Sequence, residues 1–333
     1  MNRPSTGLVL GKFMPPHIGH QFLCDFGRAA CDHLTILVCS LPDDPIPGAL
    51  RADWMRELYP DCNVVWCNEV VPQEPAESSD FWPIWRDLIA RHVGPVEAVF
   101  ASEDYGHQLA AELRAQFIPC DLARKAVPIS ATAIRADSFR CWPFIPRVVR
   151  PWFTRRVCIF GPESSGKTTL SRQLAAHFDT IALPEYGRTW TENFGVEVDA
   201  EGLRQIADGH VASRAAALRA ANRLLIEDTD PILTCVWSDM LMGSRQPWMA
   251  EALDPADLYL LTDIDFDWVD DGTRYFPDPE QRRRFHALCA RELDDRGLTY
   301  VHVSGDPATR LAQATAAVST AFSLLPQAEA RPV

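Results

Sequence analysis

The segment GKFMPPHIGH, residues 11–20, has side chains of the types and spacing that phosphate chemistry requires. Lys12, His17 and His20 follow a short apolar run, at the point where a predicted strand turns into a helix. Because the two histidines are three residues apart, both can face a phosphate chain at the positive N-terminal end of that helix. Their N–H groups and the lysine ammonium would stabilise the charge that develops when an α-phosphate is attacked and pyrophosphate departs. We therefore assign these three residues to catalysis.

A second segment with phosphate-binding character, PISATAIRAD, spans residues 128–137. Ser130 suits the cap of a helix, Thr132 follows it, and Arg135 adds a cation one turn into that helix. A pair of histidines alone would more simply be a helix cap and a surface residue. The presence of this second segment favours the functional interpretation, in which the two segments hold one triphosphate from both sides and Arg135 is catalytic.

A complete GxxxxGK(S/T) pattern runs from Gly161 to Thr168, between a predicted strand and an amphipathic helix. Its glycines allow backbone N–H groups to surround phosphate oxygens, Lys167 bridges those oxygens, and the Thr168 hydroxyl coordinates Mg²⁺. The chain has three lysines against 29 arginines, yet Lys12 and Lys167 each lie in a phosphate motif, where a compact ammonium is required. The predicted nucleotide-binding residues of this loop are Gly161, Ser164, Ser165, Gly166, Lys167, Thr168 and Thr169.

Two predicted strands end in acidic residues, within TIALPEYGR (residues 180–188) and RLLIEDTD (residues 223–230). The carboxyl ends of parallel strands meet at the ligand crevice, so these acids should face the phosphates. One acid must hold Mg²⁺, and another should accept the proton of the acceptor hydroxyl. We assign Glu185 as the general base and Asp228 or Asp230 to the metal, with Asp230 also counted among the catalytic residues. The pattern leaves this division open, and helix capping is the alternative role of Asp230.

The segment DFDWVDDGTRYFPDPEQRRRFHAL, residues 265–288, combines adjacent acids with arginines. Asp270 and Asp271 suit the 2′ and 3′ hydroxyls of a ribose, since a carboxylate accepts hydrogen bonds from both. Arg274 and the arginine cluster 282–284, with Arg283 at its centre, would form a lid that neutralises the transferring phosphoryl group. A solvated helix face is the alternative for the cluster.

At 333 residues the chain exceeds what one hydrophobic core usually organises, so two domains are expected. Short apolar runs such as GLVLG, LTILVCS and RVCIFG alternate with helical patterns, which predicts βαβ units around parallel sheets and an α/β fold in both halves. The proline-containing stretch CWPFIPRVVRPWFT, residues 141–154, is the predicted linker, because prolines remove hydrogen-bond donors and favour extended backbone. We place the domains at residues 1–145 and 146–333.

The net charge of −13 and the pI near 5.1 argue against a protein that coats nucleic acid or an anionic membrane, because those affinities come from clustered Lys and Arg. The ten cysteines form no CxxC pair and mostly interrupt apolar runs, so we interpret them as buried reduced thiols, neither disulfide partners nor zinc ligands. No apolar run reaches about 18 residues, and we expect a cytoplasmic protein without signal peptide or membrane span. The composition leaves a homo-oligomer open.

The segments GKFMPPHIGH and ISATAIR resemble the HIGH and ISxTxxR signatures of the nucleotidyltransferase superfamily, which includes nicotinamide-mononucleotide (NMN) adenylyltransferases. Other members use pantetheine phosphate, flavin mononucleotide, choline phosphate or glycerol phosphate. FWPIW, residues 81–85, resembles the stretch in which the NMN subfamily stacks tryptophan on nicotinamide, while core packing is the alternative for Trp82 and Trp85. VFASEDYG, residues 99–106, resembles the loop that receives adenine. The resemblance implies a Rossmann-like transferase domain in which ATP contacts Gly11, Phe13, Ser102, Ser130 and Thr132.

With GPESSGKT, EYGR, EDTD and WVDDGTR added, the chain resembles the NadR family of bifunctional adenylyltransferases and ribosylnicotinamide kinases over nearly its whole length. The resemblance implies a P-loop kinase that converts ribosylnicotinamide and ATP to NMN and ADP. It also implies a transferase that converts NMN and ATP to NAD and pyrophosphate, with Mg²⁺ in both steps and Trp268 as a further nicotinamide-stacking residue. Some members carry an N-terminal helix-turn-helix domain, but here the first catalytic strand begins around Thr6, so we expect no operator binding. The alternatives are another nucleoside or phosphoalcohol acceptor, or a sensor that binds NAD or ATP.

Overall fold

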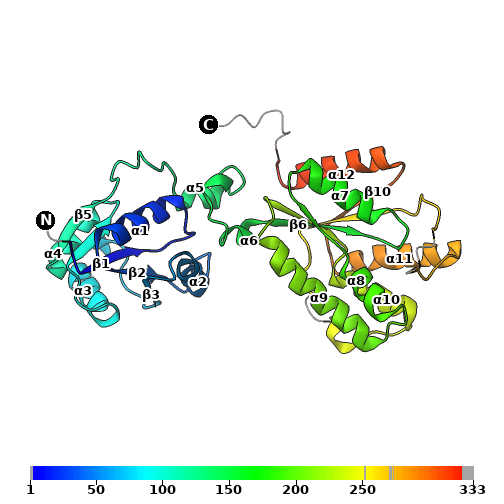
Figure 1. The fold of residues 1–333 in the computed structure, drawn as a ribbon, viewed down its shortest axis with the longest axis horizontal. Helices are drawn as coiled ribbons and strands as arrows, with labels where there is room; N and C mark the ends of the chain where they lie inside the picture. The colour runs from blue at the N-terminus through cyan, green and yellow to red at the C-terminus, as the bar shows by residue number, and fades with distance from the viewer. Residues whose placement is uncertain (1–2, 251–252, 270–271, 273, 325–333) are drawn as a thin grey trace. The chain divides into compact units, whose positions relative to one another are not determined.

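The computed structural model describes residues 3–250, 253–269, 272 and 274–324, and the chain divides into two compact units, Met1–Phe153 and Thr154–Val333 (Figure 1). Each unit is built on a five-stranded sheet in which every strand pair is parallel, and helices connect the strands. The predicted α/β class is therefore confirmed. Within the described residues, no helix combines the length and apolar character that crossing a membrane requires.

The N-terminal unit has the strand order β3-β2-β1-β4-β5, so β1 lies at the centre. Strands β2 and β3 are added on one side of β1, and the chain then crosses to the other side to add β4 and β5. Ligands of such sheets bind outside the carboxyl ends of the strands, next to this crossing point. The elements are β1 (Thr6–Gly11), α1 (Ile18–Ala30), β2 (His33–Cys39), α2 (Gly48–Leu58), β3 (Asn63–Cys67), η1 (Pro75–Glu77), α3 (Phe81–His92), β4 (Ala98–Ala101), α4 (Tyr105–Leu113), β5 (Gln116–Pro119), α5 (Ala131–Ala136), η2 (Trp142–Phe144) and α6 (Arg150–Phe153).

The C-terminal unit has the strand order β10-β9-β6-β8-β7, with its first strand, β6, at the centre. Four of its helices, α9, α10, α11 and α12, begin after an aspartate whose carboxylate accepts a backbone N–H of the first turn. The elements are β6 (Arg155–Phe160), α7 (Lys167–His177), β7 (Ile181–Leu183), α8 (Tyr186–Phe194), α9 (Ala200–Leu218), β8 (Leu224–Asp228), α10 (Pro231–Leu241), η3 (Pro247–Ala250), β9 (Leu258–Thr262), α11 (Pro279–Asp295), β10 (Tyr300–Val303) and α12 (Pro307–Ala321).

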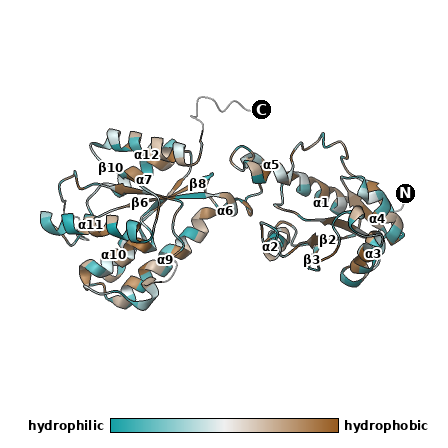
Figure 2. Cartoon of the chain, turned by 180° about the vertical axis from the view of Figure 1, so that it is seen from behind, coloured by the Kyte–Doolittle hydropathy of each residue, from teal (hydrophilic) through white to brown (hydrophobic). Residues whose placement is uncertain are grey.

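Both cores lie between sheet and helices, and the central strands are the most apolar parts of each unit (Figure 2). Leu8 and Val9 of β1 are fully buried on opposite faces of the first sheet, and Cys158 and Ile159 of β6 are fully buried in the second. Burial of both faces is the reason that these strands are continuous apolar runs in the sequence.

The boundary between the units falls after Phe153, later than the predicted boundary between residues 145 and 146. Val148 and Val149 are buried in a cluster with Trp54 of α2, Ile134 of α5 and Trp142 of η2. The proline-containing stretch is therefore mostly a packed part of the N-terminal unit, because its apolar side chains, not its prolines, decide where it lies.

Candidate active sites

A pocket in the N-terminal unit, here called the histidine pocket, collects residues from both predicted phosphate segments. Its walls include His17, His20, Ser102, Ser130 and Thr132. Lys12 and Arg135, by contrast, are exposed and are not part of its lining. The fold therefore brings together three segments that are far apart in the sequence and that follow β1, β4 and β5.

His17 and His20 hold each other in place at the start of α1. His17 is the N-cap, and its Nδ1 accepts a hydrogen bond from the backbone N–H of His20 at 3.2 Å. The two imidazole rings stack with centroids 3.7 Å apart. Because Nδ1 of His17 accepts, the neutral ring carries its proton on Nε2.

Both histidines are neutral at physiological pH. Burial, aided by the nearby Arg124 guanidinium, lowers the pKa of His17 to about 4. Burial also places the pKa of His20 well below its usual value, with smaller contributions from His17 and Arg124. The Nδ1 atom of His20 is buried without a hydrogen-bond partner among the described residues. Because both rings are neutral, their N–H groups can donate hydrogen bonds to an anion without protonating it.

The second phosphate segment is joined to the first by a direct contact. Arg135 donates to the carbonyl oxygen of Met14 at 2.5 Å and to Thr132 Oγ1 at 3.3 Å. Ser130 caps α5, because its hydroxyl accepts the backbone N–H of Ala133 at 3.1 Å. The exposed Lys12 is anchored through its carbonyl oxygen, which accepts from the buried Arg51 at 2.5 Å. The contact of Arg135 with Met14 holds the two loops together, while the catalytic role of Arg135 and the ATP contact of Ser130 stay predictions.

Several residues near the histidine pocket differ from the sequence-based assignment. Phe13 is buried and packs edge-on against His20 with ring centroids 5.0 Å apart, so it supports the imidazole from the core. Trp85 is a core residue whose indole N–H donates to the carbonyl oxygen of Pro72 at 2.9 Å. The core interpretation of Trp85 is therefore correct, because α3 turns this side chain toward the sheet. Trp82 packs half-buried at the edge of the same cluster and stays a candidate for ligand stacking.

Glu103 and Arg124 were not among the predicted site residues, yet both line the histidine pocket. Their side chains form an exposed ion pair at 2.5 Å. No local pattern marks them, since they come from separate loops after β4 and β5.

The P-loop of the C-terminal unit connects the end of β6 to the start of α7. Gly161 and Gly166 adopt positive φ angles of 141° and 82°, and a Cβ at position 161 would approach the Thr262 hydroxyl to 2.5 Å. Lys167 is held by the carbonyl oxygen of Pro162 at 2.6 Å. Ser164, Ser165, Gly166, Lys167, Thr168 and Thr169 line one pocket, here called the P-loop pocket.

Thr168 and Asp228, the two predicted Mg²⁺ ligands, are in direct contact. The Thr168 hydroxyl donates to Asp228 Oδ2 at 2.6 Å. Asp228 Oδ1 is buried without a hydrogen-bond partner within the described residues. A hydroxyl and a carboxylate oxygen beside a phosphate cradle suit Mg²⁺, which prefers hard oxygen ligands and completes its shell with water and substrate phosphates.

Glu185 and Asp230 both line the P-loop pocket but have different environments. Glu185 precedes α8 and makes no side-chain capping bond. Burial raises its pKa, the Asp228 carboxylate raises it further, and Lys167 opposes this increase. Asp230 is the N-cap of α10: its Oδ1 accepts from Ile232 N at 3.0 Å and from Leu233 N at 3.3 Å.

The other oxygen of Asp230 accepts the Tyr259 hydroxyl at 2.6 Å. Both oxygens thus make contacts that hold the fold, which favours the capping alternative for Asp230. The acid at the end of β7, Glu185, is the candidate base.

An apolar wall of the P-loop pocket was not predicted from the sequence. It is formed by Val198, Leu203, Ile206, Leu233, Trp237 and Tyr275. The rings of Trp237 and Tyr275 lie 5.5 Å apart at 64°. Trp268, which the sequence suggested as a stacking residue, is not part of this lining. It donates its indole N–H to Glu163 Oε1 at 3.2 Å.

Glu163 of the P-loop binds three donors of the segment that follows β9. Besides Trp268, its carboxylate accepts the backbone N–H of Tyr275 at 3.0 Å and that of Phe276 at 2.6 Å. Arg274, from the same segment, lines the pocket and donates to the Ser164 hydroxyl at 2.6 Å. The P-loop and the aromatic wall are therefore fastened together.

The remaining predicted lid and ribose residues are placed as follows. Arg283 lies on the exposed face of α11, as the solvated-helix alternative requires, while its neighbour Arg282 is buried and donates to the Phe266 carbonyl oxygen at 2.9 Å. Asp270 and Asp271 lie outside the described residues.

The parallel sheet, the glycine turns and the lysine and threonine at the start of α7 define a P-loop protein, and a family model described as "AAA domain" matches residues 156–310. The chain as a whole is homologous to the NadR proteins. It is 27% identical over 326 residues to the "Trifunctional NAD biosynthesis/regulator protein NadR" of Escherichia coli K12, an alignment that covers 90% of this chain and 79% of that protein. The NadR protein of Salmonella typhimurium is 26% identical over 323 residues, with 90% and 78% covered.

Two solved structures share the fold over nearly the full chain. A NadR protein in complex with NR has a TM-score of 0.78, with 24% identity and coverage of 96% of this chain and 97% of that one. A NadR protein in complex with NAD and AMP-PNP has a TM-score of 0.77, with 23% identity and 97% of each chain covered. The expected resemblance to NadR is confirmed.

Proposed function

We propose that this chain is a bifunctional enzyme of NAD biosynthesis and salvage. Residues 154–333 phosphorylate ribosylnicotinamide to NMN with ATP, and residues 1–153 adenylylate NMN to NAD with release of pyrophosphate. The single observation that carries the proposal is the hydrogen bond from Thr168 to Asp228, because Thr168 lines the same pocket as Glu185 and the aromatic wall. The homology to proteins named for NAD biosynthesis supports the choice of substrate.

In the kinase step, Glu185 accepts the proton of the ribose hydroxyl while that oxygen attacks the γ-phosphorus of ATP and ADP leaves. The raised pKa of Glu185 suits a base that must hold this proton. Lys167 and the backbone N–H groups of the P-loop hold the phosphates in line. Mg²⁺, held by Thr168 and Asp228, would neutralise charge on the phosphate oxygens. Trp237 and Tyr275 would face the nicotinamide ring, whose positive charge favours aromatic neighbours.

In the transferase step, a phosphate oxygen of NMN attacks the α-phosphorus of ATP, and the bond to pyrophosphate breaks. Neutral His17 and His20 donate N–H groups to the phosphate oxygens on which charge accumulates. Lys12 would supply the ammonium from the loop that Arg51 anchors.

The test is a time course of the purified full-length chain with ribosylnicotinamide, ATP and Mg²⁺, in which products are resolved by chromatography. NMN that appears first and is followed by NAD supports both activities. NMN without NAD, also when NMN is supplied with ATP, would reject the transferase proposal. The proposed acceptor would be wrong if no product forms and if flavin or pantetheine compounds, but not nicotinamide compounds, raise the thermal stability of the protein.

A further inference from the structure

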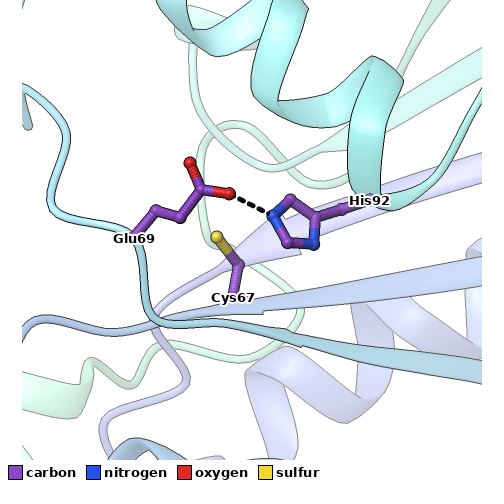
Figure 3. Close-up of side chains that lie close together, drawn as sticks. All are labelled: Cys67, Glu69 and His92. Carbon is purple, nitrogen blue, oxygen red and sulfur yellow. Dashed lines mark hydrogen bonds and ion pairs between the residues drawn. The ribbon is translucent and has the colours of Figure 1, made fainter.

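Three side chains of metal-binding type meet in the N-terminal unit, outside the lining of the histidine pocket (Figure 3). Cys67 is the last residue of β3, Glu69 follows two residues later, and His92 is the last residue of α3. The thiol sulfur, a carboxylate oxygen and an imidazole nitrogen all lie within 4.8 Å of one another. The fold thus gathers a soft, a hard and an intermediate ligand at one point.

The burial of the three residues is graded from the core to the solvent. Cys67 is 2% exposed, whereas the side chains of His92 and Glu69 are 28% and 40% exposed. The sulfur therefore forms the floor of the cluster, and the other two ligands stand at its rim. An ion can reach this position directly from solvent.

The carboxylate of Glu69 is oriented from both sides. Its Oε1 lies 2.6 Å from Nε2 of His92 (Figure 3). Its Oε2 accepts from Arg91 at 2.6 Å. Arg91 thus acts as the outer partner that metal-binding carboxylates usually have. One carboxylate oxygen and one imidazole nitrogen remain directed at each other, above the thiol.

We propose that Cys67, Glu69 and His92 bind one Zn²⁺ ion, with water in the fourth position, so that Cys67 departs from the sequence-based interpretation of the cysteines as thiols that bind no zinc. Thiolate and imidazole are ligands that select zinc over Mg²⁺, and three protein ligands plus one open position are common for zinc. A tetrahedral zinc ion separates such ligand atoms by about 3.3–3.6 Å. The three ligand atoms already lie within 4.8 Å of one another, and the partly exposed Glu69 can move away from His92 to admit the ion.

The ion replaces the proton on Nε2 of His92, whose neutral ring then carries its proton on Nδ1, and the Cys67 thiol releases its proton to solvent. The ion would link the end of β3 to the last turn of α3. Among these three residues, the hydrogen bond between Glu69 and His92 already connects the segment after β3 to α3. The proposal does not depend on the nucleotide chemistry of either pocket.

The experiment uses the full-length chain freed of metal, titrated with ZnCl₂ by calorimetry and with Co²⁺ as a spectroscopic probe. One equivalent should bind, and Co²⁺ should show a thiolate charge-transfer band, which Co²⁺ on His17 and His20 would lack. His92→Ala should weaken Zn²⁺ binding by at least about 100-fold, since loss of an outer partner alone costs about 10–100-fold. Cys67→Ser should remove the thiolate band.

Cys62→Ser is the matched control, because Cys62 is a half-buried thiol just before β3 and outside the cluster. It should bind zinc as the wild type does. The proposal is overturned if wild-type protein gives no thiolate band, or if His92→Ala binds zinc with unchanged affinity. His92 is partly exposed, so its variant decides the question even if Cys67→Ser does not fold.

Discussion

The hydroxyl of Thr168 donates a hydrogen bond to the Asp228 carboxylate across 2.6 Å and thereby joins the start of α7 to the end of β8. These residues are 60 positions apart in the chain. The second Asp228 oxygen is buried and unpaired within the described residues, beside the P-loop. An incoming cation would therefore find one carboxylate oxygen already desolvated.

Asp228→Asn should lower the rate of NMN formation by about 100-fold or more, because a neutral amide replaces a charged oxygen ligand beside the phosphates. Initial rates over a series of Mg²⁺ concentrations should also show a higher Mg²⁺ requirement. Asp208→Asn is the control, since Asp208 forms an exposed pair with Arg204 on α9 and such pairs contribute little. An unchanged rate and Mg²⁺ requirement would contradict the assignment.

Lys167→Ala and His20→Ala should separate the two activities. Lys167→Ala should abolish NMN formation and leave the conversion of supplied NMN to NAD intact, and His20→Ala should do the reverse. Chromatographic assays of each half-reaction, with thermal unfolding as a check on the fold, measure both effects. His33→Ala, at an exposed histidine of β2, should change neither rate. Loss of both activities in one folded variant would contradict independent sites.

Acid should slow the kinase step through Glu185. Burial raises the pKa of this carboxyl above its usual value, so it takes up a proton at a higher pH than an exposed glutamate does. The protonated form cannot accept the hydroxyl proton, and kcat/KM should fall as the pH decreases through this raised pKa. Glu185→Gln should lower kcat by about 10²–10⁴-fold at neutral pH. Glu192→Gln, at an exposed position of α8, the helix that Glu185 precedes, should retain the wild-type profile.

Glu163→Gln should raise the KM for ribosylnicotinamide by about tenfold and change the KM for ATP less. The amide loses acceptor capacity for the N–H groups of Trp268, Tyr275 and Phe276, so the aromatic wall is held less firmly. Steady-state kinetics with each substrate varied in turn measures this difference. The comparison variant is Glu280→Gln, in the exposed first turn of α11. An equal rise in both KM values would point to damage of the P-loop itself.

Acid should also destabilise the start of α1. The pKa of His17 is about 4 in the folded chain and about 6.5 in an unfolded one, so the unfolded state binds more protons between these values. Stability is therefore full above about pH 6.5 and declines as the pH falls toward 4. The protection factors of α1 amides, which correct for the intrinsic pH dependence of exchange, should decrease over this range. His17→Asn keeps a side-chain cap without a titrating group, and its protection factors should depend less on pH.

The contiguous motifs were predictable because their residues act through the local backbone. Lys167 and Thr168 lie where the GxxxxGK(S/T) pattern places them, since the strand, the loop and the helix follow one another without interruption. The parallel sheets were predictable for a related reason: strands buried on both faces appear as continuous apolar runs. These features need no information from distant parts of the chain.

Roles that depend on distant partners were not predictable. Glu163 contacts residues more than 100 positions away, and no pattern near it indicates that they are there. Trp82 and Trp85 are both tryptophans of α3. Only the orientation of α3 against the sheet makes Trp85 a core residue and leaves Trp82 a candidate for ligand stacking. Asp230 is a further example. From the sequence, an acid after a strand suits either a helix cap or a catalytic group, and only the structure shows that Tyr259 contacts it.

The packing of Val148 and Val149 against Trp54 and Ile134 also determines when the first unit can become complete during synthesis. A nascent chain that ends at Ile145 lacks these two valines, and its cluster around Trp54 is open to water. The ribosome must therefore release the stretch up to Phe153 before this half of the protein can close its core. A fragment cut at residue 145 should aggregate, whereas one cut after Phe153 keeps every buried side chain of that cluster.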